Sequence, residues 1–132
     1  MDDAAVRAWF DEYLRALAAR GRGEFDDLDA LLEFYGVPLL VSTDDAARVL
    51  MTAEEVTAFA GQQVEGMRAS QYHRTETLDV QVTTLNATSA IYRGEFARHR
   101  ADGAEIGRLA VTYWITDGPA GLRISALAFH TP

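Results

Sequence analysis

The chain of 132 residues has the length of one domain, which at this size buries enough surface to hold a single core without disulfides. It contains no cysteine and no lysine, which excludes thiolate nucleophiles, cysteine-bound zinc, Schiff bases and the lysine of a phosphate-binding loop. The net charge of −8 arises entirely in residues 1–60, and this acidity disfavours nucleic acids and anionic membranes as partners.

Two amphipathic segments open the chain. Residues 2–21 place large apolar side chains at helical spacing behind an aspartate cap, and a glycine at position 21 or 23 ends the helix. Residues 24–36 repeat the pattern, with aspartates in the first turn and Gly36 at the end. We therefore expect two helices before residue 37.

A short hairpin and a third helix follow. Residues 37–42 and 48–52 are short and apolar, which indicates two strands joined by a polar turn. Thr52 and Glu55 form a capping box for the helix that comes next. The apolar stripe of this helix contains one polar side chain, Gln63.

From residue 71 the apolar period changes from helical to alternating, and turn signals at residues 85–87, 101–104 and 116–121 divide the segment into four strands. Consecutive strands joined by short turns form an antiparallel meander. The expected fold class is α+β: a cone-shaped fold of three N-terminal helices packed on a curved antiparallel sheet, which consists of the short hairpin and the four-stranded meander. A single domain spans residues 1–132.

Alternation along the four strands assigns side chains to two faces. The inner face, toward the helices, is expected to carry Leu78, Val80, Val82, Tyr92, Phe96, Leu109, Val111, Tyr113, Leu127 and Phe129. The outer face is expected to carry Thr75, Thr77, Asp79, Arg93, Glu95, His99, Arg108, Thr112 and Trp114. Arg74, Glu76 and Arg98 are expected on the inner face near the open end of the cone, where an arginine either clamps a carboxylate or pairs with Glu76.

The outer face has the composition of an interface. Arg93, Glu95, Arg108, Thr112 and Trp114 combine an exposed tryptophan with charges of both signs. Aromatic and arginine side chains are enriched at protein contacts. We therefore expect a homodimer that forms through this face.

Three stretches, LLEFYGVPLLVS, RGEFARHRADGAEIGRLAVTYWI and GLRISALAFH, together with the order of elements, resemble the nuclear transport factor 2-like superfamily, and in particular its SnoaL-like and ketosteroid-isomerase-like members. The resemblance covers the whole chain and implies a curved sheet that wraps around the helices to form a conical pocket, and a homodimer. Members include isomerases, cyclases, dehydratases, epoxide hydrolases and non-catalytic binding proteins.

The resemblance also implies roles for single residues. Tyr13 matches the tyrosine of the first helix that donates a hydrogen bond to the substrate oxygen in the isomerases. Ser42 stands about where the isomerases have their aspartate base, and residues 111–113, near the second acid, contain no carboxylate, which argues against steroid isomerisation. An epoxide-hydrolase arrangement needs Asp79 beside an arginine of the next strand, but alternation places Asp79 on the outer face.

The candidate ligand-binding side chains are those expected to face the cone: Tyr13, Tyr35, Ser42, Arg74, Tyr92, Arg98 and Tyr113. Converging hydroxyls suit a ligand with one or two oxygen atoms, although buried tyrosines are also ordinary core residues. The candidate acids and bases are His130, because histidine is the side chain type best suited to proton transfer near neutral pH, and Asp44, in a turn where an aspartate otherwise bonds its own backbone. His73 and His99 are expected to face each other near His130, and His130 is expected opposite Arg108. This end of the sheet is expected to be solvated and to hold no metal site.

These observations favour a small-molecule-binding protein with an apolar, tyrosine-lined conical cavity, a small hydrophobic ligand and no cofactor. The alternative is an isomerase, cyclase or dehydratase, with Tyr13 as hydrogen-bond donor and His130 or Asp44 as acid or base. A third possibility is a scaffold with a filled cone that acts through protein partners. The acidic N-terminus differs from a secretory signal, so a cytoplasmic location is expected.

Overall fold

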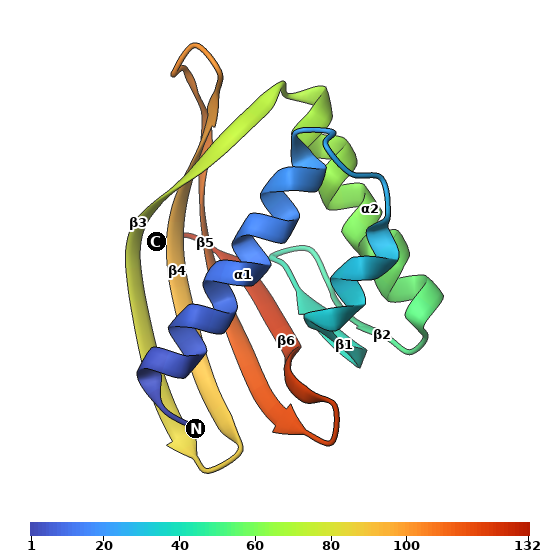
Figure 1. Ribbon diagram of the computed structural model, residues 1–132, viewed down its shortest axis with the longest axis vertical. Helices are drawn as coiled ribbons and strands as arrows, with labels where there is room; N and C mark the ends of the chain where they lie inside the picture. The colour runs from blue at the N-terminus through green and yellow to red at the C-terminus, as the bar shows by residue number, and fades with distance from the viewer.

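Six strands form one curved sheet, and the helices lie against one face of it, in the computed structural model of residues 1–132 (Figure 1). The elements in chain order are α1 (Asp3–Gly21), the 3-10 helix η1 (Leu28–Glu33), β1 (Tyr35–Ser42), β2 (Ala47–Leu50), α2 (Ala53–Ala69), β3 (Tyr72–Asn86), β4 (Ser89–Arg100), β5 (Glu105–Gly118) and β6 (Gly121–His130). The spatial order of the strands is β2-β1-β6-β5-β4-β3. The expected α+β fold, with a short hairpin and a four-stranded meander, is confirmed.

The sheet is mixed, whereas the sequence predicts an antiparallel one. β1 pairs with β6 in parallel, with Val41 opposite Leu127, and this pairing attaches the hairpin to the last strand of the meander. All other neighbouring strands are antiparallel. Turn signals specify only pairs of strands that follow one another in the chain, so they carry no information about the pairing of β1 with β6.

Both α-helices begin at the predicted caps. The Asp2 carboxylate accepts a hydrogen bond from the Ala5 amide at 2.7 Å, and the Thr52 hydroxyl accepts one from the Glu55 amide at 3.1 Å. Each cap satisfies an amide that a helix N-terminus otherwise leaves without a partner. None of the helices combines the length and the apolar composition needed to cross a bilayer.

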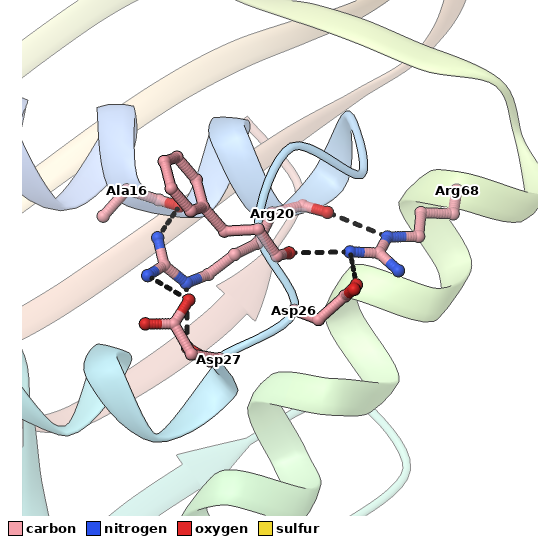
Figure 2. Close-up of polar contacts among 6 residues, drawn as sticks. Ala16, Arg20, Asp26, Asp27 and Arg68 are labelled. Carbon is pink, nitrogen blue, oxygen red and sulfur yellow. Dashed lines mark hydrogen bonds and ion pairs between the residues drawn. The ribbon is translucent and has the colours of Figure 1, made fainter.

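The second helix is shorter and tighter than predicted, and two arginines bind main-chain carbonyls at its N-terminal side (Figure 2). Arg20 donates to the Asp27 carbonyl oxygen at 3.1 Å and to the Asp27 carboxylate at 2.9 Å. Arg68, from α2, donates to the Phe25 carbonyl oxygen at 2.9 Å. The Asp27 carbonyl oxygen also accepts from the Ala30 amide of the 3-10 helix, and residues 24–27 before it are irregular.

The residues predicted at the C-terminus of the same helix belong to the sheet instead. The Ile124 amide donates to the Phe34 carbonyl oxygen at 2.7 Å, and Tyr35 is paired with Ile124 in the register of β1 and β6. Tertiary pairing with the last strand therefore overrides the helical spacing of residues 34–36.

A bulge in β3 reverses part of the predicted alternation. The register shifts between Thr77 and Asp79, so Leu78 has no partner in β4 and is 38% exposed rather than buried on the inner face. One extra residue turns the side chains before it to the opposite face. The prediction is correct for Val80 and Val82, which pack against the core.

The side chains before the bulge therefore face the side of the sheet opposite to the predicted one. Thr75 lies opposite Arg98 on the inner face. Arg74 and Glu76, predicted on the inner face, are exposed, and the Glu76 carboxylate lies 3.0 Å from Nε2 of His99. His99 is on the outer face as predicted but is only 8% exposed, so its environment is not the solvated one predicted.

Phe10 lies at the centre of the contact between α1 and the sheet and has no exposed surface. Its ring stacks on Tyr92 with the ring centroids 3.7 Å apart, and it meets Tyr13 and Tyr113 edge-on at 5.1 and 4.7 Å. Aromatic pairs of this kind add to the free energy that burial supplies. This aromatic cluster holds α1 over β4 and β5.

Replacement of Phe10 by alanine is expected to lower the free energy of unfolding by about 3–5 kcal/mol, because it leaves a cavity inside the aromatic cluster. Urea unfolding followed by circular dichroism measures the loss. Phe25→Ala is the matched control: Phe25 is 55% exposed, and its truncation should cost less than about 1 kcal/mol. Equal losses in the two variants would contradict the central position of Phe10.

Candidate functional site

A cavity of about 580 Å³, here called the outer chamber, opens between α2, the β1–β2 hairpin and the ends of β4, β5 and β6. Its walls combine apolar and polar side chains. The large apolar side chains are Val41, Phe59, Ile106, Leu109 and Phe129. Cavities of this size and character are typical of sites for small organic ligands.

A few polar side chains interrupt these walls. Gln62 and Gln63 come from the middle of α2, while Arg48, Arg98 and Arg108 come from β2, β4 and β5. Amide and guanidinium groups both donate hydrogen bonds, and the guanidinium adds a permanent positive charge. The outer chamber therefore offers donors to a ligand that carries oxygen atoms.

The outer chamber narrows to a second space of about 20 Å³, here called the inner recess. The constriction between the two spaces is formed by the residues that line both of them: Phe59, Gln63, Arg98, Leu109 and Phe129. The hydroxyl-bearing residues of the inner recess are Tyr13, Tyr35 and Tyr113. A volume of this size accommodates about one water molecule.

The three tyrosines of the inner recess are held as neutral hydrogen-bonding groups. The hydroxyls of Tyr13 and Tyr35 are 2.6 Å apart and share a hydrogen bond. Burial raises the pKa of Tyr13, Tyr35 and Tyr113, and the nearby charge of Arg98 opposes this rise in each pKa. Because these hydroxyls stay protonated, they donate or accept hydrogen bonds and do not act as bases.

Arg98 is the charged group between the two spaces. It extends from β4, where Thr75 and Gly107 lie opposite it in the neighbouring strands. Its Nε is hidden from solvent and has no hydrogen-bond partner. A buried nitrogen of this kind usually has one, so Arg98, which lines both spaces, has an unused donor.

Four of the predicted ligand-binding side chains, Tyr13, Tyr35, Arg98 and Tyr113, come together around the inner recess. Three others lie elsewhere. Ser42 is not part of the lining, because its neighbours Val41 and Thr43 face the outer chamber and alternation turns Ser42 away. Tyr92 is buried beneath Phe10, and Arg74 lies in a shallow groove between α1 and β3.

The predicted acids and bases lie outside the cavity lining. His130 is on the outer face, where its Nε2 is 2.8 Å from the Thr112 hydroxyl. Asp44 is exposed in the hairpin turn, two residues before Ala46 of the lining. Asp79 is opposite Glu95, on the outer face.

The predicted pairing of the histidines is wrong. His99 lies opposite Arg74 rather than His73, and His130 lies opposite Ala110 rather than Arg108. The β3–β4 turn lies between Asn86 and Ser89 and the β5–β6 turn between Gly118 and Gly121, each centred later than predicted, so the opposing residues differ. No group of three or more His, Asp or Glu side chains is placed to hold a metal ion.

Several lining residues are not apparent as site residues from the sequence, among them Arg48, Gln62 and Phe129. Gln63 has a signal, because it is a polar residue in the otherwise apolar stripe of α2. Arg48 has none, since a single arginine in a short edge strand is a common solvent-exposed residue.

A family model described as NTF2-like protein (DUF6841) matches residues 2–132. No curated protein is significantly similar in sequence to this chain.

Solved structures with similar folds cover nearly the whole chain. A domain of unknown function with a cystatin-like fold from Nostoc punctiforme has a TM-score of 0.71 at 19% identity, over 99% of this chain and 77% of that one. An NTF2-like protein from Novosphingobium aromaticivorans has a TM-score of 0.69 at 16% identity, over 94% and 77% of the two chains. A ketosteroid isomerase-like protein from Erwinia carotovora atroseptica has a TM-score of 0.62 at 15% identity, over 98% and 96%. At these identities the likeness concerns the fold alone.

Alkaline pH is expected to destabilise the protein through its buried tyrosines. The chain has no lysine or cysteine, so tyrosines are the only side chains that titrate between about pH 9 and 12. An unfolded chain loses tyrosine protons near pH 10, whereas the folded protein keeps them because burial raises the pKa values.

The free energy of unfolding therefore keeps its full value below about pH 9 and decreases as the pH rises, by up to about 1.4 kcal/mol per pH unit for each buried tyrosine. Urea unfolding at a series of pH values measures the slope. Tyr35→Phe should make the slope shallower, while a slope that is zero in the wild type would disprove the assignment.

Proposed function

As this chain belongs to the NTF2-like family DUF6841, we propose that it is a small-molecule-binding protein whose outer chamber holds a compact, mainly apolar ligand. The observation that carries the proposal is the outer chamber itself, a cavity of about 580 Å³ whose walls combine large apolar side chains with amide and guanidinium groups. Ligand sites combine such walls with a small number of orienting polar groups.

The constriction sets how deep the ligand reaches. The inner recess is only about 20 Å³, so the ligand ends at Gln63 and Arg98. About one water molecule fits beyond that point and can bridge an oxygen of the ligand to the tyrosine hydroxyls. In this arrangement the tyrosines orient the ligand through hydrogen bonds.

We further propose that the chain forms a homodimer through the outer face of the sheet. The strand registers align Ile91, Trp114, Ala126, Leu40 and Val49 in one apolar row across β4, β5, β6, β1 and β2. Trp114 is 48% exposed in this row.

Charges of both signs lie beside the row, at Arg93 and Glu95 in β4. A two-fold interface brings the same patch of both copies together and so needs such self-complementary charge. A second copy of this chain therefore fits the outer face in both apolar character and charge.

The ligand-binding proposal predicts saturable binding of the neutral fluorescent probe N-phenyl-1-naphthylamine. Ile106→Trp, which fills the wall of the outer chamber, should weaken binding at least about tenfold. Leu85→Trp is the matched control, because Leu85 is exposed near the β3–β4 turn, away from the outer chamber. Fluorescence titration compares the two, and an absence of saturable binding to the wild type would disprove the proposal.

The dimer proposal predicts that Trp114→Glu converts a dimer to a monomer, because it places two like charges near the centre of the apolar row. Light scattering after size exclusion measures the mass. Phe25→Glu is the control, since Phe25 is similarly exposed but lies on the helical side of the sheet. A wild-type protein that is monomeric at all concentrations tested would rule out this interface.

A further inference from the structure

Arg98 is the deepest charged group of the outer chamber and also lines the inner recess. Its Nε is the one buried side-chain nitrogen or oxygen of the chain without a hydrogen-bond partner. None of the ion pairs of the chain includes Arg98. A guanidinium stays charged in proteins, so a positive charge lies in the cavity without a counter-ion.

The walls around Arg98 supply no negative charge. The residues that line the two spaces include Arg48, Arg98 and Arg108 but no aspartate or glutamate. Of these three arginines only Arg108 is paired, with Glu105 at 3.0 Å. The chain as a whole has 20 acidic residues. Asp44, Asp45 and Glu105 are sequence neighbours of lining residues, but no acidic residue lines either space.

Enclosing an unpaired charge costs free energy, which is recovered when an opposite charge enters the site. We infer that the ligand of the outer chamber is an organic monocarboxylate, whose carboxylate binds to Arg98. This inference rests on the proposed function, since it specifies the ligand class of the same cavity.

The surroundings of Arg98 favour a carboxylate over a phosphate. Phosphates are typically bound by main-chain amides at helix N-termini. α2 begins at Ala53 but lines the outer chamber with Phe59, Gln62 and Gln63, from the middle of the helix. A planar guanidinium matches a planar carboxylate in a two-point contact, and one permanent charge neutralises one carboxylate.

The shape of the cavity also sets the orientation of the ligand. The carboxylate lies deepest, at the constriction, because the inner recess beyond it is only about 20 Å³. The apolar body then lies in the wider part of the outer chamber, between side chains such as Phe59 and Phe129. Arg48, farther from the constriction and without an ion pair, adds positive potential that attracts an anion.

The test measures three matched probes by isothermal titration at pH 7.5: naphthalene-2-carboxylate, naphthalene-2-carboxamide and 2-naphthyl phosphate. The full-length wild type should bind the carboxylate at least about tenfold more tightly than the carboxamide. Arg98→Met, which keeps the length of the side chain but removes the charge, should abolish this preference, because it weakens binding of the carboxylate more than binding of the carboxamide. Arg15→Met is the control, because Arg15 is an exposed arginine of α1 outside the cavity lining, and it should keep the preference.

Equal affinities of the wild type for the carboxylate and the carboxamide would overturn the inference and leave the proposed small-molecule binding intact. A phosphate probe that binds about tenfold more tightly than the carboxylate would also overturn it. If no naphthalene probe binds and N-phenyl-1-naphthylamine does not bind either, both proposals fail.

The stability of ligand-free Arg98→Met supplies an independent measurement. Its melting temperature should equal or exceed that of the wild type, because the substitution removes an unpaired charge from the interior. A marked decrease would show that groups of the protein itself hold the guanidinium, and would overturn the inference.

Discussion

The position of α1 over the sheet is the constraint on which the rest of the concave side depends, and Phe10 is the residue that sets it. Its ring stacks on Tyr92 and meets Tyr13 and Tyr113 edge-on, so these aromatic side chains fill the space beneath α1. The space that remains lies beyond this cluster, where α2 and the β1–β2 hairpin cover the ends of β4, β5 and β6. The packing of aromatic side chains beneath α1 therefore determines that the cavity opens at the opposite end of the cone, beneath α2 and the β1–β2 hairpin.

The groups at the constriction are not arranged for stability alone. Three tyrosine hydroxyls and a guanidinium lie in a region from which water is largely excluded, where polar groups are costly unless they are paired. Tyr13 and Tyr35 satisfy each other, but Nε of Arg98 has no partner. Proteins commonly give up stability at the sites where they bind ligands, and Arg98 fits that pattern. The two arginines of Figure 2 show the contrast, since Arg20 and Arg68 use their donors on carbonyls and aspartates of the structure itself.

Much of the fold follows from local pattern, and the exceptions arise from tertiary contacts and bulges that the pattern does not contain. The caps at Asp2 and Thr52 and the four-stranded meander are predictable because each depends on residues close in sequence. The second helix is mispredicted at its start, where Arg20 and Arg68 of the two α-helices bind main-chain carbonyls of residues assigned to it by the local pattern. In the site, alternation correctly predicts that Arg98 faces inward. Alternation fails for Arg74, which is predicted to face inward but is exposed, because the bulge at Leu78 lies between Arg74 and the correctly predicted residues.

The sequence by itself determined the α+β class, the helix starts, the order of the meander strands and the tyrosines that face the helices, since periodicity, capping and turn chemistry act over a few residues. Only the tertiary structure decided which strand the hairpin joins, which side chains close the inner recess and which arginine has a buried nitrogen without a partner. These properties depend on contacts between residues far apart in the chain, such as Val41 with Leu127 and Tyr13 with Tyr35. Neither the spacing nor the type of these residues specifies such contacts, because many alternative partners have the same local pattern.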